Sequence, residues 1–435
     1  MTKAIKQAQK RKRNRFLSSI GDVSKSLGLN TAAPTHSKRS AKSKADTAHY
    51  GKPDAVLLVI TIGLVIFGLL MVYSGSFYVA SNQLDTIFFP GNPWHYLIMQ
   101  TAWVIVGSVM AYIAYRTPMK IVRMLMLPAF FSIILLLVLT LLQPGDINGA
   151  KSWIDIGFNG IRIQPSELAK PILVVYLAAI LARPWQAKEK FEDQFKMYMR
   201  KRLIPFILVT APIVLLVLAG KDFTTAGVIG VTAFAIFFFA DNSKIHNIFI
   251  GLVPALGVVM SLVAVSIEAF RQSRIATYLA FLKDGEIINP LSTGYQLSQI
   301  MIAVGSGGLT GYGFGQSKQK YFYLQETAFS DTIFAVAAEE FGLLGGLILL
   351  VALILFLSRG FKIARKLDNK FEALLCLGIV IWLSVQSFIH LGVNVGLLPL
   401  TGLTLPLVSY GGSSLLGVLV SIGLLLNISR KVKLD

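Results

Sequence analysis

Ten apolar segments recur along this 435-residue chain, and they constrain its fold more than any other feature. A helix needs roughly 20 mostly apolar residues to cross the hydrocarbon of a membrane. Only 14% of the residues are charged, whereas soluble domains carry about a quarter. The sequence therefore predicts an all-α polytopic membrane protein with about ten transmembrane helices. These helices are placed near residues 55–75, 96–115, 122–142, 166–183, 203–219, 223–240, 246–267, 331–357, 372–393 and 405–428.

The basic residues indicate how these helices are oriented. Thirteen Lys or Arg residues lie in the polar segment 1–53, which is predicted to be a disordered tail. Further basic clusters follow the second, fourth, eighth and tenth apolar segments. Because basic loops stay in the cytoplasm, both termini are predicted to be cytoplasmic, with 54–430 as one membrane domain. The net charge of +19 reflects this topology, so a nucleic acid is excluded as a partner.

The same topology places three irregular segments outside the cell, and the longest of them is the extracytoplasmic loop 268–330 between the seventh and eighth helices. Long ordered loops are usually functional. The stretch from Gly294 to Gly342 is rich in glycine, polar groups and carboxylates. A membrane protein normally carries such composition only where backbone and charge line a cavity. The functional site is therefore expected here, around Asp331.

Asp331 opens the eighth apolar segment from its outer end. Ser330 and Asp331 are both good helix N-caps. Asp331 is also a candidate general base, a carboxylate that takes a proton from a hydroxyl nucleophile, and the two roles are compatible. Glu339 and Glu340 lie about two turns deeper, where ionisable groups rarely face lipid. They are interpreted as interior partners of basic side chains or as hydrogen-bond acceptors from a neighbouring helix.

A second candidate group is the segment from Gln164 to Lys170, at the start of the fourth apolar segment. Pro165 suits the first turn of a helix. Glu167 and Lys170 are three residues apart, so they share a helix face and can form a salt bridge. The pair either supports packing, or Lys170 also meets an anionic group of a substrate such as a pyrophosphate.

Two further segments combine glycine with polar residues. In 403–414, Pro406 and a Gly-Gly-Ser-Ser run predict a broken or kinked helix near Ser409, for close packing or for ligand binding by free N–H groups. The glycine-rich segment 305–315 is not a P-loop, and it is either an anion-binding nest or a flexible loop. Four basic residues flank it and could together hold a diphosphate: Arg271, Arg274, Lys318 and Lys320. No His/Cys cluster suggests zinc.

Four motifs in order resemble the SEDS family (shape, elongation, division and sporulation), which comprises FtsW, RodA and sporulation relatives. They read QPSELAK, GSGGLTGYGFGQSKQK, DTIFAVAAEEFGLLGG and GLLPLTGLTLPLVSYGGSSLL. The last motif resembles the FtsW branch more than RodA. The resemblance implies a ten-helix glycosyltransferase that polymerises lipid II outside the bacterial cytoplasmic membrane. It also implies a class B penicillin-binding protein as transpeptidase partner, other division or elongation proteins, and a place at the division septum.

The resemblance also implies roles for particular residues. The family's essential aspartate corresponds to Asp331, and its paired glutamate and lysine correspond to Glu167 and Lys170. Glu326 and Asp222 lie in segments that depart from the family motifs, so their roles are open. No cofactor is certain, although a divalent cation, magnesium or manganese, is compatible with a diphosphate. Two other classes remain open from the residues alone: a lipid II flippase, and a non-catalytic division scaffold.

Overall fold

The computed structural model describes most of the membrane domain. The described residues are 51–83, 90–143, 151–155, 157, 162–184, 191–241, 243, 245–251, 254, 269–285, 287 and 294–433. Nearly all of the predicted tail 1–53 therefore lies outside the described residues, as does most of the predicted seventh span. The side chains of Arg271 and Glu326 also lie outside them.

The described part of the chain is almost entirely helical. Its one sheet pairs two short antiparallel strands, β1 (Ile154–Asp155) and β2 (Arg162–Ile163). The membrane helices are α3 (Ala55–Asn82), α4 (His95–Arg116), α5 (Met119–Leu142), α6 (Pro165–Leu181), α8 (Ile204–Ala219), α9 (Phe223–Ala240), α14 (Ile333–Arg365), α15 (Lys370–Asn394) and α16 (Gly412–Ser429). The remaining elements are α7 (Phe191–Tyr198), the π-helix η1 (Met199–Leu203), α11 (Ala269–Asp284), α12 (Tyr295–Ser306), α13 (Gln319–Phe322) and the 3-10 helix η2 (Gln325–Thr327).

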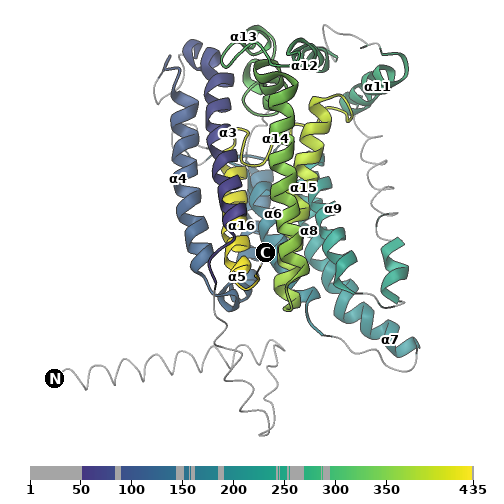
Figure 1. The fold of residues 1–435 in the computed structure, drawn as a ribbon. Coiled ribbons are helices and arrows are strands. Elements are labelled where there is room, and N and C mark those ends of the chain that lie inside the picture. The colour runs from purple at the N-terminus through teal and green to yellow at the C-terminus, as the bar shows by residue number, and fades with distance from the viewer. Residues whose placement is uncertain are drawn as a thin grey trace, which may run out of the picture. The chain divides into compact units, whose positions relative to one another are not determined.

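The predicted fold class is confirmed. Eight helices in the described residues are long and apolar enough to cross a membrane. Helix α6, with 17 residues, fills the position of the predicted fourth span although it is shorter than those eight. The long helices stand side by side, with α11, α12 and α13 gathered at one end and α7 at the other (Figure 1).

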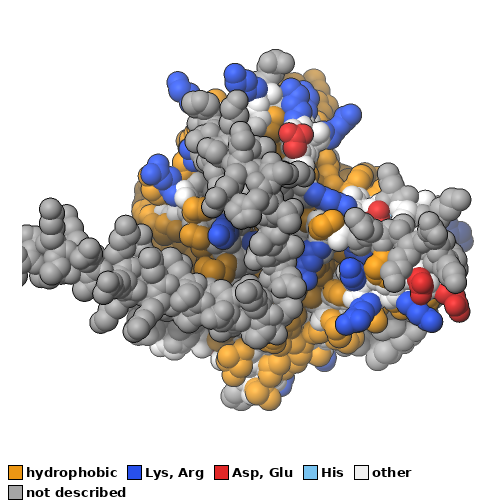
Figure 2. Space-filling model, turned by 90° about the horizontal axis from the view of Figure 1, so that it is seen from below, with side chains coloured by type: hydrophobic (Ala, Val, Ile, Leu, Met, Phe, Trp, Pro, Cys, Tyr) orange, Lys and Arg blue, Asp and Glu red, His pale blue; other side chains and the backbone are white. Residues whose placement is uncertain are grey.

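The end that carries α7 also carries the basic connections between helices. Seen from that end, Lys and Arg side chains gather among hydrophobic ones (Figure 2). Exposed basic residues on these connections include Arg116, Lys120, Arg123, Arg200 and Lys201. The extracytoplasmic loop is predicted at the opposite end, where α11, α12 and α13 are found (Figure 1). This gathering of basic side chains at one end of the bundle is expected when basic loops remain on one side of a membrane.

Helices α15 and α16 form the interior of the bundle. Helix α16 packs against α4 and α6, and α15 packs against α6, α9 and α14. Small residues allow the closest of these contacts, as is usual for helices in membranes. A Cβ on Gly423 would lie only 2.2 Å from the carbonyl oxygen of Ala111. Polar side chains on α15 and α16 therefore face other helices and not lipid.

Helix α14 is interrupted two and a half turns after it begins. Gly342 has φ 64° and ψ −165°, a conformation outside the helical region. At this break the amides of Leu343 and Leu344 donate to the carbonyls of Gly308 and Leu309, at 2.9 and 3.1 Å. The segment 307–315 thus replaces the helix's own hydrogen-bond acceptors. The sequence predicted a span over 331–357; the structure has this span as α14 and adds a break at Gly342.

The glycines of this segment are required for its close approach to α14. A Cβ on Gly311 would lie 2.2 Å from the carbonyl oxygen of Glu340. The amides of Tyr312 and Gly313 donate to the carbonyls of Glu339 and Glu340, at 3.1 and 2.9 Å. Because these N–H groups bond to protein, neither a free anion-binding nest nor a flexible loop describes 307–313. It is a structural support for α14.

The last predicted span begins later than expected. Helix α16 starts at Gly412, whereas residues 399–411 are irregular. Leu407 has φ 68°, in the left-handed region. Pro406 has no N–H to donate to a helix, and Ser409 Oγ accepts the amide of Leu405 at 2.8 Å in place of a helical carbonyl. The predicted start at 405 is therefore wrong, while the predicted break in the helix corresponds to this irregular segment.

Candidate active site

Asp331 lies in the turn immediately before α14. The N-cap position belongs to Thr332, which makes no side-chain cap bond, so the prediction that Ser330 or Asp331 caps the helix is wrong. Asn394 of α15 instead bonds to the first turn of α14. Its Oδ1 accepts the amide of Ala335 at 3.2 Å, and its Nδ2 donates to the backbone carbonyl of Asp331 at 3.0 Å. One buried side chain therefore fixes both the turn and the first helical turn, and leaves the carboxylate of Asp331 for other contacts.

The irregular segment 399–411 forms one wall beside this carboxylate. Gly402 is exposed, has φ +82°, and a Cβ built on it would lie 3.5 Å from Asp331 Oδ2. Asp331 itself is partly buried. The side chain of Asp331 therefore approaches the surface next to a residue that has no side chain of its own to cover it.

The electrostatic surroundings of Asp331 favour a proton-accepting role. Burial raises the pKa of Asp331 to about 6, and Arg274 on α11 acts against this shift. At neutral pH the carboxylate is then mostly ionised, yet it is a stronger base than an ordinary aspartate with a pKa of about 4. A general base works best when its pKa lies near the working pH.

Arg274 also lines a small cavity next to this centre. The other residues that line this small cavity are Thr277, Tyr278, Leu297, Pro399 and Leu400. The hydroxyl of Tyr278 donates to the carbonyl of Leu397, which ties α11 to the turn between α15 and the irregular segment. The cavity thus joins one cation to the segment that carries Gly402.

Ser409 supports the turn and does not face the outside. It is 4% exposed, and its hydroxyl donates to the carbonyl of Ser330 at 2.7 Å. The amide of Tyr410 donates to the carbonyl of Phe329 at 2.9 Å, and Gln100 Nε2 donates to the carbonyl of Ser409 at 3.2 Å. These bonds hold the turn that contains Asp331 against the irregular segment 399–411.

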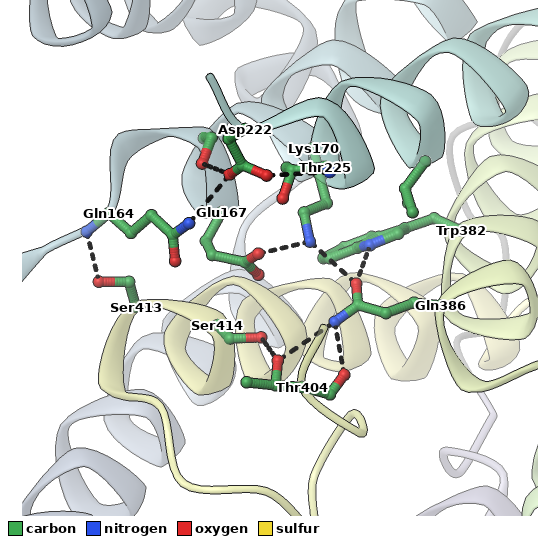
Figure 3. A network of polar contacts seen from close by, with 12 residues as sticks. Gln164, Glu167, Lys170, Asp222, Thr225, Trp382, Gln386, Thr404, Ser413 and Ser414 are labelled. Atoms are coloured by element: carbon green, nitrogen blue, oxygen red, sulfur yellow. Dashed lines mark hydrogen bonds and ion pairs between the residues drawn. The ribbon is translucent and has the colours of Figure 1, made fainter. Parts of the chain in front are cut away.

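Glu167 and Lys170 form the salt bridge that their spacing predicts (Figure 3). Lys170 Nζ lies 2.7 Å from Glu167 Oε1 and donates to Gln386 Oε1 at 2.9 Å. The exposed fractions of Glu167 and Lys170 are only 4% and 2%. The ring of Trp382 lies 5.6 Å from Lys170 Nζ. Enclosure on this scale indicates structural support, and a direct contact between Lys170 and an anionic ligand stays a prediction.

Gln164 and Asp222 form the outer part of the same network (Figure 3). Gln164 Nε2 donates to Asp222 Oδ2 at 3.1 Å, and the Gln164 amide donates to Ser413 Oγ at 3.0 Å. Asp222 caps α9 by accepting the amide of Thr225 at 3.1 Å. Burial raises the pKa of Asp222, and its bonds to Thr225 oppose the shift. The group links the starts of α6, α9 and α16.

The two glutamates deeper in α14 bond to neighbouring elements. Glu339 accepts the hydroxyl of Ser317 and the amide of Lys318. Glu340 forms a salt bridge of 2.7 Å with Lys320, whose exposed fraction is 1%. Glu340 thus has the basic interior partner that was predicted, whereas Glu339 is held by a hydroxyl and by backbone amides. Lys318, by contrast, is exposed, and its Nζ lies 5.3 Å from the ring of Tyr312.

With this geometry in view, comparison with known proteins places the chain in a family. The family model of FtsW, RodA and SpoVE, described as cell cycle proteins, matches residues 54–434. The chain belongs to the FtsW/RodA/SpoVE family. It is 35% identical over 381 residues to stage V sporulation protein E of Bacillus subtilis, covering 87% of this chain and 97% of that protein. It is 36% identical over 387 residues to the "Probable peptidoglycan glycosyltransferase FtsW" of Coxiella burnetii, with coverage of 87% and 97%.

Solved structures agree with this assignment. The crystal structure of the rod shape determining protein RodA of Thermus thermophilus matches with a TM-score of 0.59 and 26% identity, covering 88% of this chain and 98% of that one. A chain from a peptidoglycan synthase complex that coordinates polymerization and crosslinking matches with a TM-score of 0.65 and 26% identity. That match covers 87% of this chain and 98% of the other.

In this FtsW/RodA/SpoVE protein, the predicted site residues fall into three groups. Asp331, Arg274 and the supporting Ser409 come together at the start of α14. Gln164, Glu167 and Lys170 form a buried network around Gln386, and Glu339 and Glu340 fix the segment 307–320. Within the described residues, no group of three or more His, Cys, Asp or Glu could hold a metal ion.

Sequence reasoning did not single out the polar face of α15. Trp382, Gln386, His390 and Asn394 are all buried, and each follows the previous one by four residues. This spacing places them on one side of a helix. Gln386 bonds to Lys170, His390 Nδ1 donates to the carbonyl of Leu403 at 2.7 Å, and Asn394 bonds to the turn of Asp331. Polar residues repeated at this interval within an apolar segment were the signal that would have identified them.

Proposed function

We propose that this protein is a peptidoglycan glycosyltransferase that polymerises lipid II into glycan strands on the outer face of the bacterial cytoplasmic membrane. The observation that carries the proposal is Asp331, a partly buried carboxylate with a raised pKa at the outer end of a membrane helix, within a family whose relatives bear that name. The flippase alternative requires charged groups near the middle of the membrane that are reached from both sides. Asp331 and Arg274 instead lie at one end of the bundle.

The chemistry is an inverting sugar transfer between two lipid-linked disaccharides. The 4-hydroxyl of one substrate attacks the anomeric carbon of the other, and the bond from that carbon to the undecaprenyl diphosphate breaks. The hydroxyl proton passes to Asp331, and the diphosphate departs with the bonding electrons. The raised pKa of Asp331 suits it to accept this proton.

Negative charge that develops on the leaving diphosphate requires a cation nearby. Arg274 is best placed among the described residues, because it influences Asp331 electrostatically and lines the adjacent cavity. Arg271 precedes it by three residues on α11 and stays a candidate. A magnesium or manganese ion would find few protein ligands among the described residues. It would be held mainly by diphosphate oxygens and water, which is the usual coordination of magnesium.

The proposed partner is a class B penicillin-binding protein that crosslinks the new strands. A structurally similar chain belongs to a complex that couples polymerization to crosslinking. We also propose that both termini are cytoplasmic, because the basic connections gather at one end of the bundle (Figure 2). Action at the division septum with other division proteins follows from the resemblance to FtsW.

The test is polymerisation of lipid II by the purified full chain, alone and with its cognate class B penicillin-binding protein. Wild type is expected to form long glycan, and Asp331→Asn is expected to form none while remaining folded. Asp284→Asn is the matched control, since Asp284 is an exposed aspartate in the same extracytoplasmic loop. Activity retained in Asp331→Asn would remove Asp331 as the base. Wild type without glycan but with headgroup translocation would favour a flippase.

A further inference from the structure

Gln386 lies at the centre of the buried network, and every hydrogen-bonding position of its amide is used (Figure 3). Its Oε1 accepts from Lys170 Nζ at 2.9 Å and from Trp382 Nε1 at 2.8 Å. Its Nε2 donates to the carbonyl and the hydroxyl of Thr404, at 2.9 and 3.3 Å. The residue has no exposed surface. A glutamine amide offers two lone pairs and two hydrogens, so Gln386 has no capacity left for a ligand.

The chemistry of its neighbours fixes which way this amide points. The Lys170 ammonium and the Trp382 indole N–H are donors only. Both therefore need the oxygen of Gln386, and the nitrogen must face Thr404. The carbonyl of Thr404 can only accept, which agrees with this orientation. No rotation of the amide would satisfy these three groups, so Gln386 is an oriented link between α6 and the irregular segment that follows α15.

Thr404 connects this link to the wall beside Asp331. It lies two residues after Gly402, whose Cβ position is 3.5 Å from Asp331 Oδ2. Between them, the carbonyl of Leu403 accepts from His390 Nδ1 at 2.7 Å. On its other side, Thr404 Oγ1 shares a hydrogen bond of 3.0 Å with Ser414 Oγ at the start of α16. Thr404 is thus tied to two helices, α15 and α16, and the neighbouring backbone forms the edge of the Asp331 centre.

We propose that Gln386 is a positioning residue for glycosyl transfer, holding the segment 399–404 against Asp331 without touching the substrate. The inference rests on the proposed function, because it assigns Gln386 a role through the carboxylate that function uses. The buried pair of Glu167 and Lys170 then acts as an anchor for the active-site wall. Gln386 thus connects the family motif around Lys170 to the irregular segment near Thr404, although the two are more than 200 residues apart.

The experiment compares wild type, Gln386→Met and Thr404→Val in the lipid II polymerisation assay with the transpeptidase partner, across pH 5 to pH 8. Methionine keeps the shape of glutamine and removes both halves of the amide. We expect kcat to fall roughly tenfold in Gln386→Met with little change in KM, as for loss of an interaction that matters in the transition state. We also expect the acid limb of kcat/KM to move below pH 6, because a loosened wall admits water to Asp331.

Thr404→Val tests the residue that accepts the hydrogen bonds of Gln386. It carries less risk to folding, since Thr404 is only partly buried. It should change the same quantities in the same direction by a smaller amount. Ser384→Ala is the control on the same helix, because its hydroxyl donates only to the carbonyl of Val380 within α15. Thermal unfolding of each variant in detergent shows whether it is folded.

Three outcomes separate the inference from the function it rests on. A folded Gln386→Met with unchanged kcat and unchanged pH profile overturns the positioning role and leaves the glycosyltransferase intact. A lower kcat with an unmoved acid limb in both variants also overturns it, since the effect then does not act through Asp331. A wild type that makes no glycan with a verified partner contradicts the proposed function itself.

Discussion

Asp331 and Glu167 are both acidic residues at the starts of membrane helices, yet one is firmly paired and the other is not. Glu167 sits 2.7 Å from a lysine that is itself enclosed, in a network that also includes Gln386. Asp331 lies beside an exposed glycine, with Arg274 as the cation that influences it. The paired Glu167 fixes Lys170, and Lys170 in turn bonds to Gln386 and so links α6 to α15. A carboxylate that burial has made more basic, and that still approaches the surface, can exchange a proton.

The comparison is tested most strongly by removing the lysine of the buried pair. Lys170→Met should leave the Glu167 carboxylate buried and unpaired, and lower the free energy of unfolding by about 3 kcal/mol or more. Thermal unfolding followed by the fluorescence of the adjacent Trp382 measures this. Adding Glu167→Gln should restore most of the stability, because no charge then stays buried without a partner. A Lys170→Met variant as stable as wild type would contradict a supporting role for this pair.

A second test asks whether access to the Asp331 carboxylate past Gly402 is needed for activity. Gly402→Val should reduce kcat/KM roughly tenfold or more, because the new side chain approaches Oδ2 and a β-branched residue is strained at positive φ. Gly285→Val is the matched control. Gly285 has φ +70°, close to the +82° of Gly402, but nothing lies within 4 Å of its Cβ position. Equal losses in the two variants would mean that strain alone is responsible.

The third test uses the pKa of Asp331. With a pKa of about 6, kcat/KM should be constant at neutral pH and fall about tenfold per pH unit well below 6. Because the folded pKa lies above the unfolded value near 4, the carboxylate reduces stability when ionised, and stability should rise as pH falls through this window. Asp331→Asn should therefore melt at a higher temperature than wild type at pH 7.5, and the difference should vanish near pH 4. Identical melting curves at both pH values would contradict a buried, destabilised carboxylate.

The smallest effect is expected at Lys318. Its side chain is exposed over Tyr312, while the neighbouring Lys320 forms the buried salt bridge with Glu340. Lys318→Ala should change kcat/KM by less than about threefold, as is typical of surface substitutions. Polymerisation rates at low and high salt measure this. A large, salt-dependent loss would return Lys318 to the set of diphosphate ligands.

The sequence predicted the membrane helices well, because lipid requires every spanning backbone to bond within its own helix and so imposes long apolar runs. It also predicted the Glu167–Lys170 pair, since three residues of separation place both on one helix face. It missed the break at Gly342, because that break depends on acceptors supplied by Gly308 and Leu309, far away along the chain. The start of α16 was missed because small and apolar residues suit both a helix and an irregular buried segment.

The support of α14 by 307–315 is made through the main chain, and this has a consequence for how the protein can change during evolution. The side chains of Leu309, Tyr312 and Phe314 remain 69%, 48% and 43% exposed. Substitutions at these three positions can alter what the outer surface offers to lipid or protein while the register of the backbone is kept. Insertion or deletion of a single residue would instead misalign four hydrogen bonds at once. Relatives are therefore expected to agree in the length of this segment.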